Sequence, residues 1–571
     1  MKILLLVHNF NSLSQRLFVE LREAGHEVSV EFDINDLVSM EAVDLFKPDL
    51  LIAPFLKRAI PESIWGRITC LVVHPGPPGN RGPSALDWAI LNGEKSWGVT
   101  LLQANGVLDG GDIWASETFP MRTAPKGSLY RNEVTEAAVT ATLRAVNNFT
   151  ESGFRPQTQW QLPGGSKIES HPLATGHDRL INWEEDGLDT VVRKIHSADG
   201  APGVPDHLFR RDLSLYDVQP EFHLSGKAGA VIARSGPAIC RATADGKAVW
   251  IGRLRDRESN HPFKLPATTV LADEIAKLPE VTVESENSSD SSGYREISYE
   301  QIGDIGLLHF SFYNGAMGAT QCQQLLSAYR HAREQNSHAI VLLGGEDYWS
   351  NGMDLNQIEA AESTADESWK NINVLDDLAL EIINTDDRLT ISALQGGAGA
   401  GGVFLARTAD FLWARDGVIL NPHYKDMGNL YGSEYWSYLL PRYTGRDNAE
   451  HIIRTRLPMG TAEAERIGLV DAAYGANRKE FIKETLQRTK KLVVQPGFEK
   501  LLEKKRRQRS EDEAIQPLAT YREQELEKMR MNFYGFDPSY HIARYNFIHK
   551  IPKSRTPLTL ALHRRTTKSW A

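Results

Sequence analysis

One histidine and one aspartate in the first third of the chain have the residue types needed for acid/base work at a carbonyl carbon. His74 ends an apolar run and opens a loop rich in proline and glycine, and Asp109 stands in a later glycine-containing loop. A protonated imidazole can stabilise a tetrahedral oxyanion, and a carboxylate can hold that imidazole in position. A local hydrogen bond in a turn explains either residue alone. Their spacing and the string that flanks them favour a catalytic pair.

A second group lies in segment 421–436, which is dense in polar and aromatic side chains. It contains His423, Tyr424, Tyr431 and Glu434. A structural hydrogen bond explains each residue taken separately. As a group, however, they can donate and accept protons, and they predict an acid/base site.

A glycine run precedes this segment. Residues 397–402 satisfy the pattern G-x-G-x-x-G and follow an apolar run, as a dinucleotide-binding turn does. Only residues 403–409 separate the run from the next strand-like stretch. We expect that interval to be too short for a crossover helix in a parallel sheet, and we therefore reject a dinucleotide site.

Alternating strands and a helix are expected to position His74. Apolar runs predict strands at residues 2–7, 28–30, 50–53 and 70–73. Residues 13–24 have helical spacing, which gives a β-α-β beginning. Such strands form a parallel sheet covered on both faces, and ligands bind beyond the carboxyl ends of the strands, where His74 is expected.

Two polar stretches, 160–176 and 284–293, are predicted linkers. A small, mainly β region lies between them, further strands and helices follow the second, and the last part of the chain has a helical pattern. We predict an α/β multidomain chain of four parts: a Rossmann-like domain at 1–165, a small β-rich, OB-like domain at 177–280, an α/β domain at 295–475 and a helical segment at 476–571.

Composition excludes several classes of protein. Of 571 residues, 41% are hydrophobic and 24% are charged, which excludes collagen-like, coiled-coil and largely disordered chains. The net charge of −10 argues against a nucleic-acid partner. This charge is unevenly spread, because residues 476–571 carry 22 basic and 11 acidic residues and leave −21 for residues 1–475.

Cysteine usage and hydropathy indicate the compartment. Cys70, Cys240 and Cys322 are too far apart in sequence to suggest a disulfide framework or a thiolate metal site, so we expect no metal and a reducing environment. The apolar N-terminus turns polar at His8, too early for a signal peptide, and no apolar run long enough to span a membrane follows. We expect a cytoplasmic protein without membrane or nucleic-acid partners.

The first group of residues belongs to a specific string. HPGPPGNRGP at 74–83, GVT at 98–100 and LDGGD at 108–112 together resemble the N-terminal domain of the 10-formyltetrahydrofolate-dependent formyltransferases, over roughly residues 1–160. The β-rich region that follows resembles the second domain of methionyl-tRNA formyltransferases. The resemblance implies that His74 stabilises the oxyanion of formyl transfer, and that Asp109 orients His74 and takes part in proton transfer.

The same resemblance implies a pterin site beside a loop at residues 49–56, closed by residues 103–109. The candidate folate contacts are Pro54, Phe55, Leu56, Lys57 and Gln103. A place in the core explains Phe55 and Leu56 equally well. The family carries an asparagine where this chain has Val72, so Asn80, another donor or a different acceptor must compensate, or the transfer is slow.

The later markers resemble the crotonase (enoyl-CoA hydratase/isomerase) fold over roughly residues 296–480. They are YWSNGMDL at 348–355, ALQG at 393–396 with the glycine run behind it, and AEAERIGLVD at 462–471. The resemblance implies that the backbone N–H groups of Asn351 and Gly401 polarise a thioester carbonyl. Tight packing also explains the glycines.

One departure from the crotonase pattern limits the reaction. The two carboxylates with which hydratases deliver water fall on Phe404 and on His423 or Tyr424 in this chain. Without those carboxylates, hydration is not expected.

A formyltransferase-like half joined to a crotonase-like half with segment 421–436 resembles the HypX/HoxX family of nickel–iron hydrogenase maturation factors, over nearly the whole chain. The resemblance implies that a formyl group passes from 10-formyltetrahydrofolate to coenzyme A, and that formyl-CoA is then decarbonylated to carbon monoxide and CoA. Tyr424 and Glu434 would be the acid/base pair, while Asn351 and Gly401 hold the carbonyl oxygen. Hydrogenase iron-site maturation proteins would be the partners.

Coenzyme A requires cations for its phosphates and a path for its pantetheine arm. Arg16, Lys57, Arg131 and the basic tail are candidates for the phosphates, with plain surface charge as the alternative, and an internal channel is expected for the arm. Two other functions stay open. One is a non-catalytic carrier or scaffold for hydrogenase maturation, which Val72 favours. The other is formyl transfer to a different acceptor beside an unrelated acyl-CoA activity.

Overall fold

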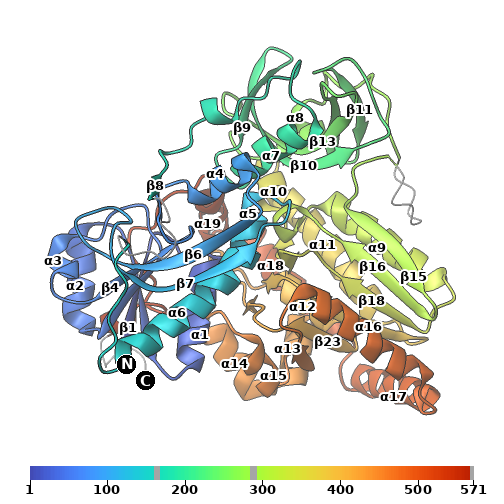
Figure 1. Cartoon of the computed structure of the whole chain (residues 1–571). Helices are drawn as coiled ribbons and strands as arrows, with labels where there is room; N and C mark the ends of the chain where they lie inside the picture. Colours follow the sequence, from blue (N-terminus) through green and yellow to red (C-terminus); the bar gives the residue numbers. More distant parts are fainter. Residues whose placement is uncertain (160–167, 283–291, 566–571) are drawn as a thin grey trace. The chain divides into compact units, whose positions relative to one another are not determined.

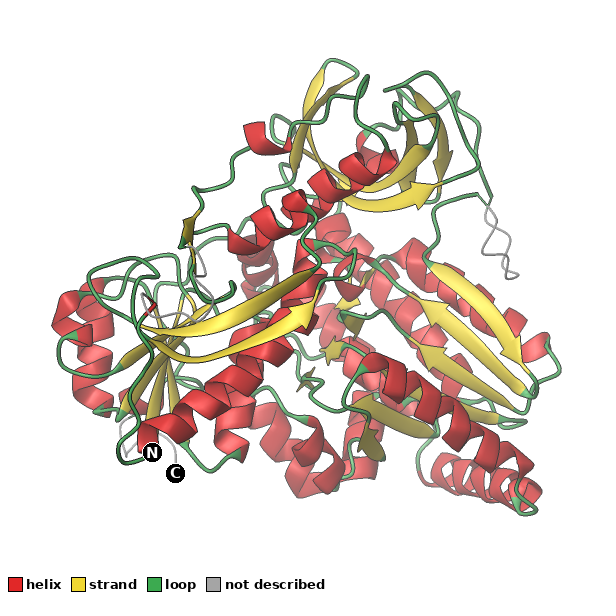
Figure 2. Cartoon of the chain, viewed as in Figure 1, coloured by secondary structure: helices red, strands yellow, loops and turns green. Residues whose placement is uncertain are grey.

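The computed structural model divides the chain into two compact units, drawn in Figures 1 and 2. The structure describes residues 1–159, 168–282 and 292–565. Unit 1 consists of Met1–Val281 and Lys553–Ala571, and unit 2 consists of Thr282–Pro552. The four-part division stays a prediction.

The predicted linkers fall partly outside the described residues. Of the stretch 160–176, residues 168–176 are described, and of 284–293 only the last two residues are.

The first sheet of unit 1 has six strands in the order β2-β1-β3-β4-β6-β7. These strands are β1 (Lys2–Val7), β2 (Glu27–Phe32), β3 (Leu50–Phe55), β4 (Cys70–His74), β6 (Ser96–Gln103) and β7 (Ile113–Pro120). The strands β1 to β4 are parallel, as predicted, but β6 and β7 are antiparallel to their neighbours. The sheet is therefore mixed, and β7 follows β6 through a loop without a helix, a connection that suits an antiparallel pair.

Helices cover both faces of this sheet (Figure 1). The helices α1 (Ser12–Glu23) and α6 (Thr135–Thr150) contact each other and the sheet, and α2 (Asp36–Phe46) contacts β1 and β2. In β1, the five residues after Lys2 are all buried. Burial on both faces explains why this strand reads as an unbroken apolar run instead of an alternating one.

A small β-rich domain completes the first part of unit 1, as predicted. The short strand β14 (Leu265–Pro266) pairs with β13 in a six-stranded sheet whose other five, antiparallel strands have the order β11-β12-β13-β10-β9. These five are β9 (Val204–Leu208), β10 (Arg211–Glu221), β11 (Val231–Ser235), β12 (Ala238–Ala242) and β13 (Ala248–Asp256). The helix α7 (Leu188–Ala198) packs on β10 and contributes Leu188, Val191 and Ile195 to the core.

Unit 2 contains a six-stranded sheet of order β15-β16-β18-β21-β23-β25, parallel except for β15. The strands are β15 (Ile297–Ile302), β16 (Ile305–Phe310), β18 (Ala339–Leu343), β21 (Leu389–Leu394), β23 (Phe411–Arg415) and β25 (Ala472–Tyr474). The helices α9 (Ala319–Glu334) and α11 (Thr364–Ile383) pack on each other, and their buried side chains join the core of this unit.

A second, three-stranded parallel sheet positions the residues of the later markers. It consists of β19 (Tyr348–Ser350), β22 (Gly397–Gly399) and β24 (Leu420–Asn421). Asn351, Gly401 and Tyr424 follow these three strands closely in sequence. The carboxyl ends of parallel strands lie at one edge, so the three residues come from the same edge of this sheet.

One sequence argument was wrong. The helix α12 (Gly401–Arg407) does lie between β21 and β23, which are neighbouring parallel strands. Seven residues of helix are enough, because β22 carries the chain away from the main sheet before α12 begins. The short interval at 403–409 therefore does not exclude a dinucleotide-binding turn at 397–402. The argument against such a site depends on the fold alone.

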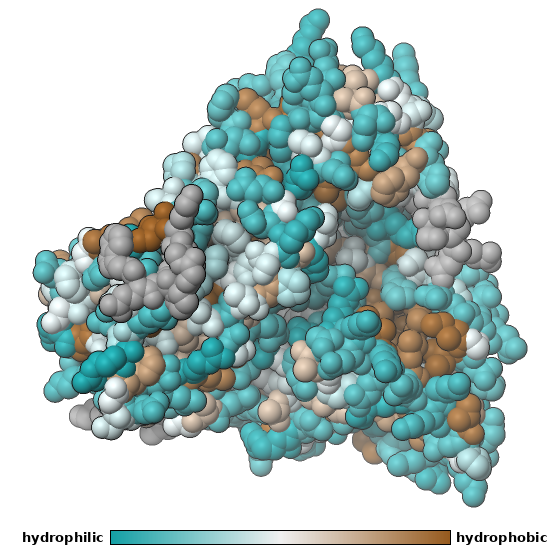
Figure 3. All heavy atoms as spheres, in the orientation of Figure 1, coloured by the Kyte–Doolittle hydropathy of each residue, from teal (hydrophilic) through white to brown (hydrophobic). Residues whose placement is uncertain are grey.

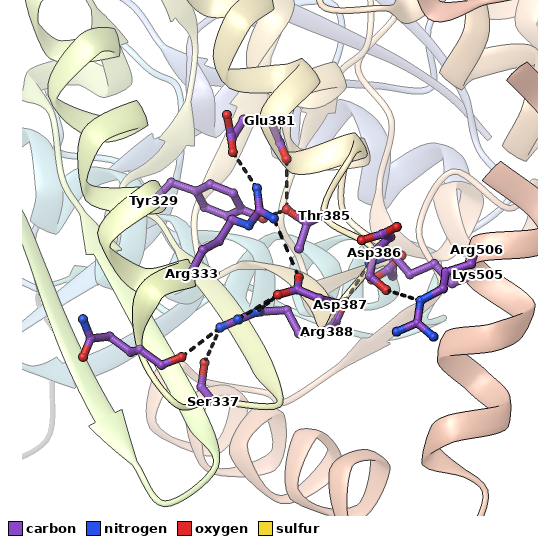
Figure 4. Close-up of polar contacts among 12 residues, drawn as sticks. Tyr329, Arg333, Ser337, Glu381, Thr385, Asp386, Asp387, Arg388, Lys505 and Arg506 are labelled. Carbon is purple, nitrogen blue, oxygen red and sulfur yellow. Dashed lines mark hydrogen bonds and ion pairs between the residues drawn. The ribbon is translucent and has the colours of Figure 1, made fainter. Parts of the chain in front are cut away.

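Helices complete unit 2: α16 (Arg478–Val494), α17 (Phe498–Ile515), α18 (Leu518–Tyr534) and α19 (Ser539–Ile548). Figure 4 shows Lys505 and Arg506 of α17 reaching toward the turn after α11. Lys505 Nζ donates to the Arg388 carbonyl at 2.8 Å, and Arg506 Nε donates to the Asp386 carbonyl at 3.1 Å. These two cations of the basic tail therefore have structural contacts within unit 2.

The last described residues return to unit 1 and cover β2, the edge strand of its first sheet. The Val30 N–H donates to the Leu560 carbonyl at 3.1 Å, and the Phe32 N–H donates to Thr556 Oγ1 at 2.8 Å. The buried Glu31 carboxylate accepts from Thr556, from His563 at 2.8 Å and from Arg564 at 2.6 Å. Burial alone would raise the pKa of Glu31, but these hydrogen bonds outweigh it and lower the pKa.

The face of the molecule drawn in Figure 3 is mainly hydrophilic, with apolar residues in small groups. Among the described residues, no helix is both long and apolar enough to cross a membrane.

Candidate active sites

His74 and Asp109 lie together in unit 1. His74 is the last residue of β4, and Asp109 belongs to the loop between β6 and β7. The distance from His74 Nδ1 to Asp109 Oδ2 is 3.6 Å, and both side chains are largely buried. Asp109 has φ +50° and its carboxylate accepts from the Gly82 N–H at 3.1 Å. A non-glycine residue in the left-handed region is uncommon, and such backbone clusters at functional sites.

Asn80 occupies the other side of the His74 ring. His74 Nε2 and Asn80 Oδ1 are 3.1 Å apart. Asn80 is the first residue of the short strand β5 (Asn80–Arg81), so an asparagine amide does lie next to the imidazole, although Val72 replaces the family asparagine. Val72 itself lies inside β4, between two strands of the sheet.

The predicted folate contacts lie at the carboxyl end of β3 and at the end of β6. Pro54 and Phe55 end β3, and Leu56 and Lys57 follow them, with Lys57 exposed. Gln103 pairs with Leu71 across the sheet, three residues before His74 in β4. Its side-chain oxygen accepts from Trp114 Nε1 at 3.1 Å. The last residues of β3 are therefore at the same edge of the sheet as His74, whereas Gln103, which pairs with Leu71, lies nearer the opposite edge.

The two arginines predicted for coenzyme A come from helices of unit 1. Arg16 of α1 is buried, bonds Glu20 at 2.7 Å and lies 3.8 Å from Glu136. Arg131 belongs to a single π-helical turn, Tyr130–Val134. Single π-helical turns inside α-helices occur frequently at functional sites.

In unit 2, Tyr424 and Glu434 form a buried pair. Tyr424 Oη donates to Glu434 Oε2 at 2.5 Å, and the two side chains are 6% and 1% exposed. Burial, followed by the charge of Asp376, raises the pKa of Glu434 to about 8, although the hydrogen bond from Tyr424 opposes this. Burial and the neighbouring Glu434 raise the pKa of Tyr424 well above its usual value. At neutral pH, Glu434 can therefore hold a proton or release it.

The glycine run brings Gly401 against Glu434. A Cβ on Gly401 would lie 2.7 Å from the carboxyl carbon of Glu434, closer than van der Waals contact allows. Gly401 is the first residue of α12, so its N–H is one of the amides that have no acceptor within the helix. The turn at Gly352 lies beside it, because a Cβ on Gly352 would be 3.6 Å from the Gly401 nitrogen.

The second predicted amide donor is engaged in this conformation. The Asn351 N–H donates to the Gly315 carbonyl at 2.7 Å, and its side chain donates to the Asn314 carbonyl at 2.8 Å. Asn351 is thus near Gly401, because the next residue, Gly352, lies beside Gly401. The Asn351 N–H must, however, break its hydrogen bond with the Gly315 carbonyl before it can polarise another carbonyl.

The positions of the hydratase carboxylates are apolar or aromatic here. Phe404 is fully buried and stacks on Tyr424, with ring centroids 5.3 Å apart and planes at 18°. His423 is buried, and burial lowers its pKa. Tyr431 packs on Trp436 at 5.3 Å and is only partly buried. The structure therefore brings Tyr424 and Glu434 together and leaves His423 and Tyr431 outside their hydrogen bond.

Sequence reasoning missed Asp376 of α11, Ser433 and Glu525 of α18, which surround Glu434. The two carboxylates are fully buried, and Ser433 Oγ lies 2.7 Å from Asp376 Oδ2 and 3.3 Å from Glu525 Oε2. Asp376 and Glu525 lie on the buried faces of their helices, where apolar residues are usual. That pattern is visible in the sequence, but it does not indicate which loop the acids meet.

Among the described residues, no group of three or more His, Cys, Asp or Glu side chains could hold a metal ion.

Fold and sites together define a protein with a formyltransferase half followed by a crotonase-fold half. The chain matches the formyl transferase family over residues 31–146 and the enoyl-CoA hydratase/isomerase family over residues 308–533. It is 26% identical over 187 residues to a methionyl-tRNA formyltransferase from Syntrophus aciditrophicus, covering 32% of this chain and 58% of that one.

Two similarities extend over the whole chain. It is 54% identical over 564 residues to the hydrogenase maturation factor HoxX of Bradyrhizobium diazoefficiens, covering 99% of this chain and 97% of that protein. It is also similar to the crystal structure of HypX from Aquifex aeolicus in complex with tetrahydrofolic acid, with 48% identity, a TM-score of 0.96 and full coverage of both chains. The chain belongs to the HoxX family of hydrogenase maturation factors.

Proposed function

We propose that the protein makes carbon monoxide for nickel–iron hydrogenase maturation in two steps. The first moves a formyl group from 10-formyltetrahydrofolate to coenzyme A, and the second decarbonylates formyl-CoA to carbon monoxide and CoA. The observation that carries the proposal is the buried Tyr424–Glu434 pair, which lies against Gly401. Membership of the HoxX family and the folate complex of the similar HypX structure support it.

In the formyl-transfer step, the CoA thiol attacks the formyl carbon and the folate nitrogen leaves. The tetrahedral intermediate carries an oxyanion beside His74, whose other ring nitrogen faces Asp109 at 3.6 Å. His74 stabilises that charge through Nε2 and Asp109 holds the ring, so the Asn80 oxygen, 3.1 Å from Nε2, must leave this nitrogen when the oxyanion forms. The thiol proton goes to the departing folate nitrogen. Pro54, Phe55, Leu56, Lys57 and Gln103 are the proposed folate contacts, and Arg16 and Arg131 the proposed cations for CoA.

Decarbonylation requires no oxidant, because one proton moves from carbon to sulfur. The formyl C–H bond and the C–S bond break, an S–H bond forms, and carbon monoxide leaves. The Glu434 carboxylate accepts the formyl proton, and the Tyr424 hydroxyl protonates the sulfur. The 2.5 Å hydrogen bond between them then returns the proton to Tyr424. The Gly401 N–H stabilises the carbonyl oxygen, and Asn351 joins it once its N–H leaves Gly315.

Exclusion of water distinguishes this reaction from hydrolysis of the same thioester. Phe404 and Tyr424 stack in place of the hydratase carboxylates, and both are buried. The apolar Phe404 ring cannot orient water as a carboxylate does, and the Tyr424 hydroxyl is engaged with Glu434, so the acyl carbon is protected from hydrolysis.

The test is to mix the protein with 10-formyltetrahydrofolate and CoA and to trap carbon monoxide with ferrous haemoglobin. We expect release that needs both co-substrates, and no signal above background would refute the proposal. If folate turnover continues undiminished without CoA, the acceptor is a different molecule. Hydrogenase maturation that survives His74→Ala would indicate a carrier or scaffold instead of an enzyme.

A further inference from the structure

The backbone around Glu434 has an unfavourable conformation. Glu434 and the next residue, Tyr435, both have φ +59°. Side chains with a Cβ rarely adopt the left-handed region, and two consecutive non-glycine residues there require support from their surroundings. The support determines where the Glu434 carboxyl points.

Two buried carboxylates provide that support from distant helices. Asp376 Oδ1 of α11 accepts from the Glu434 N–H at 2.8 Å. Glu525 of α18 accepts from the Tyr435 N–H at 3.0 Å and from the Ser437 N–H at 2.8 Å. The amides on both sides of the strained turn are therefore bound by acids that are far away in sequence.

Ser433 links these two acids. Its hydroxyl lies within 2.8 Å of both Asp376 oxygens and 3.3 Å from Glu525 Oε2. The single hydroxyl proton of Ser433 can be donated to only one carboxylate at a time. A hydrogen bond between Ser433 and the other acid therefore requires that acid to be protonated and to donate to the Ser433 oxygen. Burial raises the pKa of Asp376 to about 6 and that of Glu525 to about 8, which is consistent with a shared proton.

The other charged and titratable groups around Glu434 come from four places. Tyr424 follows β24, Asp377 lies on α11, Cys322 on α9 and Arg522 on α18. Arg522 bonds Asp377 at 2.7 Å and is 3.9 Å from Asp376. Its charge is thus directed first to the half-exposed Asp377, and the buried acids are only partly compensated.

We propose that Asp376 and Glu525 are positioning residues for decarbonylation. They hold the turn at 433–437 so that Glu434 stays against Gly401 and Tyr424. They also share a proton through Ser433, and this proton sets the protonation state of Glu434. The proposal rests on the proposed function for its kinetic consequence. Its geometric part does not depend on that function, because the hydrogen bonds fix the turn whatever the substrate.

The test compares Asp376→Asn with Asp377→Asn, its neighbour on α11, as a matched control. The assay measures carbon monoxide release from supplied formyl-CoA across pH. Removing the Asp376 charge lowers the pKa of Glu434, so the rise of kcat with pH moves to lower pH. We also expect kcat to fall by roughly a hundredfold with little change in KM, as a displacement of about 1 Å can cause. A profile equal to that of Asp377→Asn overturns the proposal.

Two further variants separate the parts of the proposal. Ser433→Ala removes a hydrogen bond that lowers the pKa of Asp376, so Asp376 takes up a proton more readily and the profile moves in the same direction by less. Glu525→Gln loosens the turn and is expected to lower kcat with the smallest pH shift. If Ser433→Ala leaves the profile unchanged, the shared proton is refuted, and if Glu525→Gln leaves kcat unchanged, its positioning role is refuted.

Infrared titration of the protonated carboxyl band gives an answer without turnover. Glu434→Gln identifies the Glu434 band, and Asp376→Asn should shift its titration to lower pH. If the wild-type protein releases no carbon monoxide, the proposed function fails, and this titration still tests the positioning role. An unshifted band overturns the latter, whether or not the protein is active.

Discussion

Replacing Tyr424 with phenylalanine removes one oxygen atom from the centre of the second site. The ring stays the same size, so its stacking on Phe404 at 5.3 Å is retained. The hydroxyl loses its contacts with Glu434 at 2.5 Å and with the Ser433 carbonyl at 2.9 Å, and its single proton serves one of these two acceptors at a time. Because hydrogen bonds to charged groups contribute about 1.5–3 kcal/mol, we expect the free energy of unfolding to fall by about that amount.

The effect on the proposed reaction is larger. A positioned general acid contributes about 10²–10⁴-fold, which corresponds to about 3–5 kcal/mol in the activation free energy. The tyrosine hydrogen bond lowers the pKa of Glu434, so its removal raises that pKa above about 8. The rise of activity with pH therefore moves to higher pH in Tyr424→Phe, opposite to the shift expected for Asp376→Asn.

The assay is single-turnover release of carbon monoxide from formyl-CoA, measured over a range of pH. A thermal unfolding curve for each variant shows that the protein is folded. An unchanged rate with an unchanged profile in folded Tyr424→Phe would refute the acid/base assignment. A slower rate with an unshifted profile would mean that Tyr424 acts on the sulfur without influencing Glu434.

Four other outcomes are expected. Gly401→Ala places a methyl group against the Glu434 carboxyl, so carbon monoxide release should fall by roughly a hundredfold while folate turnover continues, as assays of the two half-reactions would show. His74→Ala should abolish formyl transfer but leave release from supplied formyl-CoA intact, and loss of both would contradict separate sites. Burial raises the pKa of Glu434 in the folded state to about 8, so the folded state binds more protons than the unfolded chain. The stability that this group contributes therefore falls as pH rises from about 4.5 to about 8. Denaturant titrations over this pH range should show a weaker decline in Glu434→Gln. The pKa of Glu31 is lowered instead, so its contribution is lost as the solution becomes acidic, and Glu31→Gln should flatten that limb of the stability curve.

Local pattern was sufficient for the elements near each site. The apolar runs predicted as strands at 50–53 and 70–73 lie in β3 and β4, because burial on both faces removes the alternation that marks other strands. Residue types predicted an acid/base group in segment 421–436, and the HypX/HoxX resemblance singled out Tyr424 and Glu434, whose separation of ten residues allows one loop to fold back on itself. The antiparallel direction of β6 and the crossover at α12 depend on three-dimensional connections that no short stretch encodes.

The residues that hold Glu434 were beyond local reasoning. Glu525 lies 90 residues from Tyr435, and Asp376 lies 58 residues from Glu434. Each is an acid on the buried side of a helix, and the sequence alone offers a solvent-facing position as the simpler explanation. Only the packing of α18 on α11 brings both to the same turn.

The return of residues 553–565 to β2 imposes an order on biosynthesis. The β2 amides that donate to Thr556 and Leu560 belong to an edge strand, and these partners leave the ribosome more than 500 residues after it. At roughly 5–20 residues per second, unit 2 alone takes on the order of tens of seconds to synthesise. During that interval β2 is an open edge with an unpaired glutamate one residue before its end, and an inward charge of this kind discourages strand addition by other nascent chains. We therefore expect Glu31 to protect the open edge of β2 during synthesis and afterwards to bind segment 553–565.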